Sequence, residues 1–485
     1  MIQPCQSRKE TIDLEAKRKL IDIFQSAAGK RAWFRARNRY YYAELLRLLR
    51  FIIPEGKRVL EAGCADGYVL RKLKPSFGLG IDFSPRMVQL ARTSTPQDQE
   101  GNVRFLEADV ESVTFTEKFD YIVLSDLLGN LLDIQQALEN LRSACHEETR
   151  LVINYHSILW EPLLRRAARL GFKMPSNHHN WISRSDIENF LKLSDYAIVK
   201  HQVRLLAPVR IPLLSRFLNG FVARLPLING LCLTNIVVAR AVEKDRVKDR
   251  SVSIVIPCRN EKGSVRAAIE RMPRFGTDQE IIFVDGHSTD GTVEEIEGIM
   301  KEFPDRRIKL LHQQDKGKGD AVRLGFAEAT NDILMILDAD LSVPPEDLPK
   351  FYNAVVTGKG EFINGSRLVY PMEKQAMRFL NILGNKFFSV ALSWVLGQSL
   401  KDTLCGTKAI SRANYEKIVS NRELFGDFDP FGDFDLLYGA AKLNLDIVEI
   451  PIRYRSRTYG ETNIARFLHG WLLLKMTVLG LRKFV

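Results

Sequence analysis

The first half of the chain alternates short apolar runs with segments that have the spacing of amphipathic helices. Glycine or acidic residues follow several of the apolar runs. This alternation is typical of β-α-β units and predicts an α/β domain with a parallel sheet. In such sheets, ligands bind at the edge formed by the carboxyl ends of the strands. The expected strands lie near residues 58–61, 79–82, 103–106, 121–124 and 151–154.

Residues 243–250 carry charges of alternating sign. They separate this half from a second half that also alternates apolar runs with helical segments but has different turn sequences. We therefore expect two different α/β domains, residues 1–243 and 251–485, joined by a linker at 244–250. In the second domain the expected strands lie near residues 252–256, 281–284, 308–311, 333–337 and 362–365.

Composition excludes some classes of protein but does not indicate which reaction this one catalyses or what it binds. The 485 residues are 45% hydrophobic and 27% charged, which excludes a mainly disordered chain. The net charge of +11 favours an anionic partner: nucleic acid, a phosphorylated small molecule or an acidic membrane surface. The six cysteines form no C-x-x-C pair, which favours a reducing compartment. We expect neither a secretory signal nor a transmembrane helix.

The main local signal in the first domain is a glycine-bearing turn in the run RVLEAGCADG (58–67). Glycine is needed where the backbone approaches a ligand closely, although a lone glycine turn is weak evidence. Asp82 ends the next strand, about 20 residues after Glu61, where an acid can bind ribose hydroxyls. Asp109 follows the third strand. Three strands thus end in polar groups along one sheet edge.

Residues 58–154 resemble the class I S-adenosylmethionine-dependent methyltransferases, with VLEAGCADG as the cofactor turn. The resemblance implies a Rossmann-like fold that binds S-adenosyl-L-methionine. Ala65 stands where many members carry another glycine. The methyl acceptor is not indicated, and His156, His178 and His179 are candidate bases with no preference among them. The residues implied are Glu61, Gly63, Cys64 and Gly67 for the amino-acid part of the cofactor, Asp82 for the ribose and Asp109 for the adenine.

Two basic segments of the first domain leave alternatives open. Residues 196–242 contain no acid, and arginines interrupt their proline-broken apolar strings. This lobe suits an anionic bilayer, a substrate lid or a domain interface. Residues 30–50 mix seven basic residues with five aromatics, a combination that can bind nucleic acid. No nucleic-acid motif accompanies them, so a helix packed on the first domain or on lipid is the preferred interpretation.

The second domain carries four motifs in the turns after its strands. In the last of them, Asp338 and Asp340 end a buried strand, where their carboxylates repel each other unless a hard cation lies nearby. Mg²⁺ typically uses one or two carboxylates together with phosphate oxygens. Such a metal would offset the charge of a departing nucleoside diphosphate. The motifs are PCRNE (257–261), DGHSTDGT (285–292), KGKGDA (316–321) and DAD (338–340).

With GSR (365–367) and DTLCG (402–406), these motifs make residues 252–457 resemble the family 2 glycosyltransferases of the glycosyltransferase-A fold. The likeness is greatest to the polyprenyl-phosphate (dolichol-phosphate) mannosyl and glucosyl synthases. It implies a nucleotide-sugar donor, either GDP-mannose or a UDP-hexose, and Mg²⁺ or Mn²⁺. Gly286 and His287 replace the commoner Asp and Ser, which bears on nucleotide preference. The residues implied are Pro257, Asn260, Glu261, Asp285 and Asp290 for the nucleotide sugar, Lys318 and Gly319 for its pocket, and Asp338 and Asp340 for nucleotide and metal.

The acceptor can be argued from its chemistry. A sugar hydroxyl must lose a proton, so an enzyme acting on it needs a base, and Asp433 or Asp435 fits that role. A lipid phosphate is already charged and needs only cations to hold it. Arginine binds phosphate well. The arginines expected there are Arg367, which is also a catalytic candidate, Arg453, Arg455 and Arg457.

Two apolar segments of the second domain predict contact with a membrane. Residues 451–485 carry seven basic residues against one Glu and predict a helix lying on a bilayer. Residues 387–400 predict an uncharged apolar helix. Core helices of a soluble domain are the alternative for both. By itself, Asp290 likewise fits a helix N-cap.

The leading hypothesis is a two-domain enzyme on the cytoplasmic face of the cell membrane. Its second domain would transfer a hexose from a nucleotide sugar to polyprenyl phosphate, with metal assistance and inversion as the resemblance implies. Its first domain would be a methyltransferase. Two alternatives stay open: transfer to a sugar hydroxyl in polysaccharide or glycolipid assembly, and a first domain that binds without catalysing. Nucleic acid is not an expected partner.

Overall fold

The computed structural model divides into two compact units, residues 1–243 and 244–485. Each unit is described by itself. The expected linker at 244–250 lies largely outside the described residues. Those residues are 2–4, 14–99, 101–174, 180–225, 228–242, 249–315, 317–367, 379–421, 432–452, 459 and 466–484.

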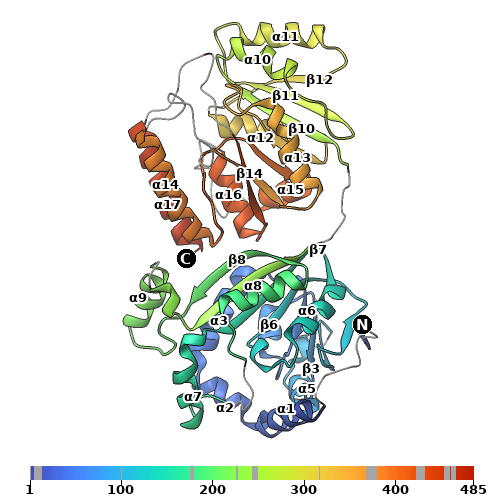
Figure 1. Ribbon diagram of the computed structural model, residues 1–485, viewed down its shortest axis with the longest axis vertical. Coiled ribbons are helices and arrows are strands. Elements are labelled where there is room, and N and C mark those ends of the chain that lie inside the picture. Colours follow the sequence, from blue (N-terminus) through green and yellow to red (C-terminus); the bar gives the residue numbers. More distant parts are fainter. Residues whose placement is uncertain are drawn as a thin grey trace. The chain divides into compact units, whose positions relative to one another are not determined.

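The first unit is built on a seven-stranded sheet in the order β4-β3-β2-β6-β7-β9-β8 (Figure 1). The strands expected from the sequence are all present and run parallel to one another. The expectation of an all-parallel sheet is wrong at one side, because β9 runs antiparallel to both β7 and β8. The strands are β2 (Arg58–Ala62), β3 (Phe77–Asp82), β4 (Val103–Glu107), β6 (Phe119–Ser125), β7 (Cys145–His156), β8 (Tyr196–Arg204) and β9 (Thr234–Ala241).

Strands β8 and β9 lie in the acid-free segment 196–242, which the sequence suggested as a surface lobe. That expectation needs correction, since β9 is buried along almost its whole length and β8 is half-buried. The apolar runs at both ends of the segment are therefore strands of the sheet. The part between them, with α9 (Leu214–Gly220), stays at the surface, and the side chain of Leu213 is 89% exposed.

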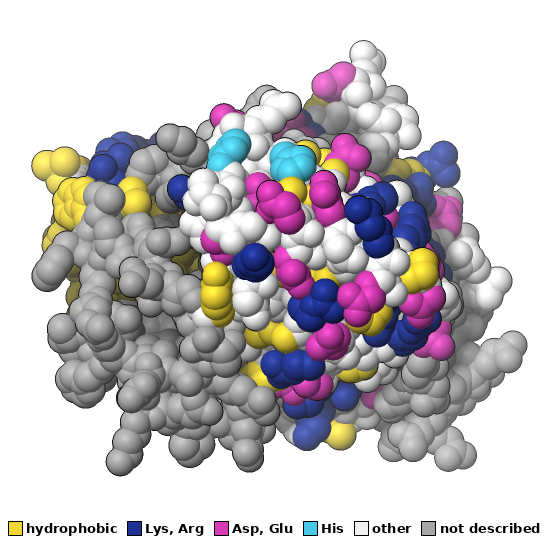
Figure 2. Space-filling view, turned by 90° about the horizontal axis from the view of Figure 1, so that it is seen from above, with side chains coloured by type: hydrophobic (Ala, Val, Ile, Leu, Met, Phe, Trp, Pro, Cys, Tyr) yellow, Lys and Arg dark blue, Asp and Glu magenta, His cyan; other side chains and the backbone are white. Residues whose placement is uncertain are grey.

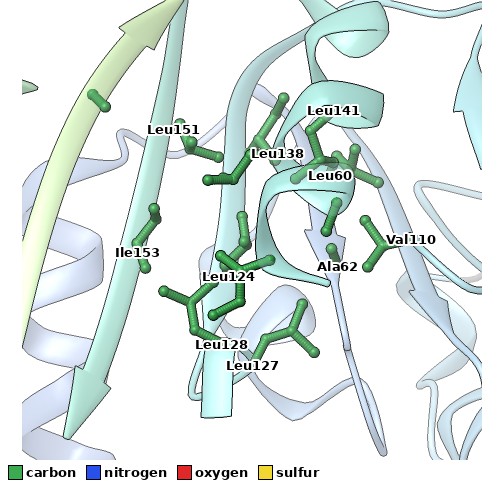
Figure 3. Close-up of a cluster of buried hydrophobic side chains, with 14 of the residues drawn as sticks. Leu60, Ala62, Val110, Leu124, Leu127, Leu128, Leu138, Leu141, Leu151 and Ile153 are labelled. Atoms are coloured by element: carbon green, nitrogen blue, oxygen red, sulfur yellow. The ribbon is translucent and has the colours of Figure 1, made fainter. Parts of the chain in front are cut away.

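Helices pack on both faces of this sheet and make two apolar cores. In one core, Leu60, Leu124 and Leu151 from three neighbouring strands point toward Leu138 and Leu141 of α6 (Figure 3). The other core takes the buried face of α3, so the basic segment 30–50 includes a helix packed on the first unit. The remaining elements are β1 (Ile2–Pro4), which pairs with β5 (Val113–Phe115), and the helices α1 (Leu14–Ala27), α2 (Arg31–Arg37), α3 (Arg39–Ile52), α4 (Tyr68–Leu73), α5 (Pro85–Thr93), α6 (Ile134–Leu141), α7 (Glu161–Arg169) and α8 (Arg184–Leu193).

The second unit is also α/β, with a seven-stranded sheet in the order β12-β11-β10-β13-β15-β14-β16. All the strands expected from the sequence are present. The sequence did not reveal two strands, β15 and β16. Strand β15 runs antiparallel to both of its neighbours, and β16 runs parallel to β14. The strands are β10 (Val252–Cys258), β11 (Gln279–Asp285), β12 (Arg307–His312), β13 (Ile333–Ile336), β14 (Phe362–Ser366), β15 (Lys408–Ser411) and β16 (Ile447–Pro451).

The outer helices α10 and α11 present a mixed-charge surface. Arg266 of α10 pairs with Glu295 and Glu302 of α11, and Arg271 pairs with Glu346. Figure 2 shows acidic and basic side chains interspersed over this face of the second unit. The net positive charge of the chain is therefore not concentrated here. The helices of the unit are α10 (Lys262–Glu270), α11 (Thr292–Glu302), α12 (Lys318–Glu328), α13 (Leu348–Val356), α14 (Phe379–Leu396), α15 (Arg412–Ser420), α16 (Asp433–Lys442) and α17 (Arg466–Phe484).

Helices α14 and α17 lie side by side, and each is partly a core helix (Figure 1). The expected helix at 387–400 instead spans Phe379–Leu396, because Gly397 adopts a left-handed conformation and ends it. Leu392 is fully buried, whereas Phe387 and Trp471 are more than half exposed. Among the described residues, no helix is both long and apolar enough to cross a membrane.

Glycine at position 325 lets α12 lie directly on β10, because a Cβ there would overlap the side chain of Val255. We expect Gly325→Ala to lower the free energy of unfolding by about 1–3 kcal/mol through overpacking. Gly298→Ala in α11 is the matched control, because its Cβ would meet nothing within 4 Å. That change should stabilise the helix by up to about 1 kcal/mol. Urea unfolding followed by circular dichroism compares the two, and equal effects would contradict the packing argument.

Candidate active sites

The turn after β2 follows a left-handed path at three positions: Gly63, Ala65 and Gly67 have φ angles of 71°, 47° and 69°. The N–H groups of Gly63 and Cys64 donate to the Ile81 carbonyl at 2.8 and 3.0 Å, which ties the turn to β3. A Cβ at Gly67 would overlap the Phe105 ring, so glycine is required there. Ala65 adopts its conformation at a cost of about 1–2 kcal/mol. The turn thus keeps its path with alanine at this position.

Asp82 braces the same turn from the end of β3. Its two carboxylate oxygens accept the N–H groups of Ala65 and Ser84, each at 2.9 Å. Burial raises the pKa of Asp82, while these two hydrogen bonds act in the opposite direction. Because a carboxylate oxygen can accept more than one hydrogen bond, the predicted role on the ribose is compatible with these contacts. That role stays a prediction.

Glu61 is buried between β2 and α4. Its carboxyl accepts the N–H group of Leu70 at 3.0 Å. Burial raises the pKa of Glu61 to about 8, although this hydrogen bond and nearby arginines lower it. Without a ligand, the side chain is therefore mostly protonated at neutral pH. A cationic group such as the ammonium of an amino acid would favour its ionised form.

Basic side chains of the N-terminal helices form salt bridges with two acids at the carboxyl-terminal edge of the first sheet. No sequence motif indicated these salt bridges. Arg35 of α2 forms a salt bridge with Asp66, in the cofactor turn. Lys17 of α1 pairs with Asp109, with 2.8 Å between Nζ and Oδ2. One arginine of the basic segment 30–50 is therefore paired with an acid of the same unit. The predicted adenine-binding role of Asp109 is untested by this contact.

In the second unit, the turns after β10 and β11 are joined by hydrogen bonds. The Oδ1 atom of Asn260 accepts the N–H group of Thr289, and its own N–H group donates to Ser288, both at 2.9 Å. The N–H group of Glu261 donates to Thr292 at 3.0 Å. The structure thus brings the predicted nucleotide-sugar residues Pro257, Asn260, Glu261, Asp285 and Asp290 together at one sheet edge.

The two acids of these turns hold backbone groups in place. Asp285 accepts the N–H groups of His287 and Ser288 at 3.1–3.3 Å. Asp290 accepts the N–H group of Thr292 at 3.0 Å, a capping-type contact at the start of α11. Burial opposes ionisation of Asp290, but its hydrogen bonds outweigh burial and lower the pKa. The expectation that Asp290 is the N-cap is wrong, because Gly291 holds that position. The nucleotide-binding role of Asp290 stays a prediction.

Asp338 follows β13 and forms an ion pair with Lys318, the first residue of α12, with 2.5 Å between Nζ and Oδ1. Burial opposes ionisation of Asp338, but Lys318, Lys408 and Arg367 outweigh it, so the pKa lies below its ordinary value. Gly406 closes over this pair, since a Cβ there would overlap both the carboxylate and the ammonium. The ion pair therefore sits in a confined and cation-rich place.

The donor set suits a divalent cation that takes ligands from a substrate as well. Asp340 lies two residues beyond Asp338, and its Oδ1 atom accepts the N–H group of Ser342 at 3.0 Å. Among the described residues, no cluster of three or more His, Cys, Asp or Glu side chains can enclose a metal. A site made of protein ligands alone is thus not found in that part of the chain. Two carboxylates fit Mg²⁺, which completes its octahedron with phosphate oxygens and water.

Arg367, expected to hold the acceptor phosphate, forms a bidentate salt bridge with Asp402 at 2.7 and 2.9 Å. Asp402 is fully buried, and it also accepts a hydrogen bond from Nδ2 of Asn385 at 2.8 Å. Burial opposes ionisation of Asp402, but Arg367 outweighs it and lowers the pKa to about 2. The salt bridge fixes the direction of the guanidinium, and its binding to phosphate stays a prediction.

The start of α16 lies against the start of α12, because a Cβ at Gly432 would come within 2.7 Å of the Gly319 Cα atom. This contact places the predicted base Asp435, which is 7% exposed, on a helix next to the Lys318 turn. Asp433 begins the same helix. The side chain of Asp433 lies outside the described residues, as do Arg453, Arg455 and Arg457.

Comparison with protein families identifies both halves. Residues 34–201 match the family model for a methyltransferase domain, and residues 253–419 match the model of glycosyl transferase family 2. The chain joins a methyltransferase domain to a family 2 glycosyltransferase domain. Both resemblances inferred from the motifs are confirmed, and so is the α/β fold of each half.

Three relatives illustrate the similarity. A dolichol-phosphate mannosyltransferase of Pyrococcus furiosus is 30% identical over 221 residues, which are 44% of this chain and 59% of the relative. A UDP-N-acetylglucosamine–dolichyl-phosphate N-acetylglucosaminyltransferase of Methanococcus voltae is 26% identical over 236 residues, 45% of this chain and 90% of the relative. An undecaprenyl-phosphate 4-deoxy-4-formamido-L-arabinose transferase of Enterobacter sp. is 27% identical over 222 residues, 44% and 62%. The chain thus spans less than two thirds of the first and third relatives.

The buried carboxyl of Glu61 predicts a pH dependence of stability. Between its ordinary pKa of 4.5 and about 8, the folded state keeps a proton that the unfolded state has lost. The free energy of unfolding should therefore fall as the pH rises through this window, by at most about 1.4 kcal/mol per pH unit. Glu61→Gln should remove this dependence, because the amide is neutral and still accepts the Leu70 N–H group.

Denaturant unfolding of the full chain at about pH 5 and about pH 8 measures this difference. Glu107→Gln, an exposed position at the end of β4, is the matched control and should follow the parent protein. If Glu61→Gln kept the same pH dependence as the parent, Glu61 would not be the group responsible.

Proposed function

We propose that the glycosyltransferase domain moves a hexose from a nucleotide sugar to polyprenyl phosphate, and that the other domain is an S-adenosylmethionine-dependent methyltransferase. The observation that carries the first proposal is the acceptor shared by the relatives. Their names differ in the sugar, from mannose to N-acetylglucosamine to a deoxy-formamido-arabinose. Each of them names dolichol phosphate or undecaprenyl phosphate, and both are polyprenyl phosphates.

The electrostatics of the site support a phosphate acceptor. An acceptor phosphate is already ionised at neutral pH, so an oxygen of it can attack the anomeric carbon without a protein base. The bond from that carbon to the nucleoside diphosphate breaks, its electron pair stays on the departing phosphate oxygen, and the configuration inverts. Lys318, Lys408 and Arg367 supply positive charge around Asp338 for two phosphate-bearing substrates.

Asp338 and Asp340 are the residues that would hold Mg²⁺ or Mn²⁺. When bound, the metal would offset the negative charge that develops on the departing nucleoside diphosphate. Lys318 occupies the Asp338 carboxylate in the absence of ligands. We infer that the ammonium is displaced when the cation and the nucleotide bind, and that it then contacts the diphosphate.

Exposed apolar surfaces support a place at the membrane. In the methyltransferase domain, Leu213 and Phe217 are exposed beside Arg210 and Arg216, in a segment that contains no acid. Contiguous apolar and basic surface of this kind fits the interface of an anionic bilayer. In the glycosyltransferase domain, large apolar side chains are exposed on α14 and α17 among the side chains that the structure describes there: Phe387, Val390, Trp471, Leu474 and Val478.

Transfer to lipid is tested with the full chain, undecaprenyl phosphate in detergent micelles, Mn²⁺ and a panel of nucleotide sugars labelled in the sugar. We expect sugar label in the lipid extract with at least one donor. Asp340→Ala should lower the rate about 100-fold or more, because it removes a metal ligand. Asp305→Ala, an exposed acid of the same unit, is the control and should leave the rate unchanged. Label that appears only in a sugar-hydroxyl acceptor, with none in lipid, would contradict the proposal.

The ion pair between Lys318 and Asp338 predicts competition with the metal. Lys318→Ala should tighten Mn²⁺ binding to the nucleotide-free protein by about tenfold, because the cation no longer displaces an ammonium from the carboxylate. The same change should slow sugar transfer. Lys350→Ala, which removes an exposed lysine paired with Asp347, is the matched control. Titration of Mn²⁺ followed by electron paramagnetic resonance measures the affinity, and weaker binding to Lys318→Ala would refute displacement.

A further inference from the structure

Asp126 lies at the carboxyl-terminal edge of the first unit's sheet, one strand away from the cofactor turn. It directly follows β6, which pairs with β2 on one side and with β7 on the other. Its left-handed backbone, with φ of 52°, is uncommon for a residue with a side chain and recurs at functional turns. A Cβ at Gly63 would come within 2.6 Å of Leu127, so the cofactor turn packs on the residue next to Asp126.

Polar side chains from three elements converge on the Asp126 carboxylate. The Tyr41 hydroxyl of α3 lies 2.9 and 3.1 Å from its two oxygens, and Nδ2 of Asn154 donates to Oδ1 at 2.7 Å. The Nε2 atom of His156, the last residue of β7, lies 3.7 Å from the same oxygen. The side chains of Asp126 and His156 are 26% and 11% exposed, so the group is reachable at the sheet edge. None of the sequence motifs includes Asp126.

One atom of this network points to a ligand. Asn154 is fully buried, and its Nδ2 atom is directed at Asp126. Its Oδ1 atom has no hydrogen-bond partner. Buried amide oxygens are nearly always paired, and an orphan calls for an absent donor. A second hydroxyl of the ligand, next to the one that reacts, would supply that donor.

The surroundings of His156 keep its ring neutral. Burial lowers the pKa of His156 and outweighs the opposing effect of Asp126, and Lys173 lowers it further. The Tyr41 ring, 5.8 Å away, belongs to a hydroxyl whose pKa is raised by burial and by Asp126, so Tyr41 stays protonated. Arg31 and Tyr42 face Asp126 from α2 and α3. A neutral imidazole backed by a carboxylate can accept a proton at physiological pH.

A cavity with both polar and apolar lining residues lies in the same unit, and Ser157, the residue after His156, is part of its wall. Its volume is about 330 Å³, within the range of small-molecule sites. Burial lowers the pKa of His201 in its wall to about 4, and the Nε2 atom of His201 has no hydrogen-bond partner. Hydroxyl and amide groups beside apolar side chains suit a ligand that presents both hydroxyls and apolar surface, such as a sugar. The polar lining residues are Ser157, Ser183, Arg184, His201, Asn229 and Asn235.

We propose that Asp126 and His156 form the acceptor side of the methyltransferase site and that the acceptor is a hydroxyl of the sugar that the other domain attaches to lipid. This inference rests on the proposed function of both domains. The acceptor hydroxyl oxygen forms a bond to the methyl carbon, and the carbon–sulfur bond of the sulfonium breaks with its electron pair staying on sulfur. The hydroxyl proton passes to the His156 imidazole. Asp126, held by Tyr41 and Asn154, then stabilises the imidazolium.

His156 is the catalytic residue in this scheme, and Asp126 positions it. With the full chain, undecaprenyl phosphate, an accepted nucleotide sugar and methyl-labelled S-adenosylmethionine, methyl label should enter the lipid extract only when the nucleotide sugar is present. His156→Ala should lower methyl transfer about 100-fold or more. Sugar transfer should be unchanged, and calorimetry should show S-adenosylmethionine affinity within about twofold of the parent. His146→Ala, a half-exposed histidine of the same unit, is the matched control and should behave as the parent.

Asp126→Asn separates the positioning role from a structural one. Loss of the carboxylate lowers the pKa of His156 further, so the acid limb of the pH profile for methyl transfer should move to lower pH while the maximal rate falls. An unshifted profile would refute the positioning role. Lipid that carries sugar label but no methyl label would overturn the inference and leave the glycosyltransferase proposal intact. Absence of sugar label from the lipid would overturn both. Unchanged methyl transfer in His156→Ala would exclude His156 as the base.

Discussion

A carboxylate that is buried away from water must pair with a cation, accept several N–H hydrogen bonds or take up a proton. The candidate site residues at the carboxyl-terminal edges of both sheets follow this constraint. Asp338 has the ammonium of Lys318. Asp82 has two backbone N–H groups. Glu61 takes a proton, because burial raises its pKa. These three arrangements differ in how easily the carboxyl group can change its partner when a ligand binds.

An acid that is bound to backbone N–H groups stabilises a turn, whereas an acid that is bound to a side chain can exchange its partner. The contacts of Asp82 are to backbone N–H groups of the turn after β2 and of its own turn, so breaking them would disturb the local fold. The partner of Asp338 is a flexible side chain, and an ammonium can give way to a metal ion without any change in the backbone. Gly406 packs over that ion pair, so a side chain at this position would overlap both partners. The flexibility of the Lys318 side chain supports its proposed displacement.

The sequence predicted most of the parallel strands because each is an apolar run followed by a polar turn, but it missed β16. It also did not predict β9 or β15, whose antiparallel direction depends on the partner strand and is not encoded by periodicity. The acid-free segment 196–242 looked like a surface lobe for the same reason: its end strands are apolar, and only pairing with β7 shows that they belong to the sheet. At α14 the apolar run continues to Leu400, but Gly397 ends the helix earlier.

Motifs likewise pointed to candidate residues whose contacts are made within one turn or between neighbouring turns. They missed the pairs that join distant segments, such as Lys17 with Asp109 and Arg35 with Asp66, because no short pattern records a contact made only after folding. The candidate base is the clearest example. Three histidines were equivalent in sequence, and the fold places one of them, His156, at the end of β7 beside Asp126. His178 and His179 lie outside the described residues.

The two proposed transfers have opposite acid–base requirements. A phosphate acceptor is ionised already, so a base would add nothing and positive charge is what its site must supply. A hydroxyl acceptor carries a proton that has to leave, so its site must supply a base. Lysines and an arginine surround Asp338 in one domain, and an imidazole stands against a carboxylate in the other. The distribution of charge in each site therefore supports glycosyl transfer to a phosphate in one domain and methyl transfer to a hydroxyl in the other.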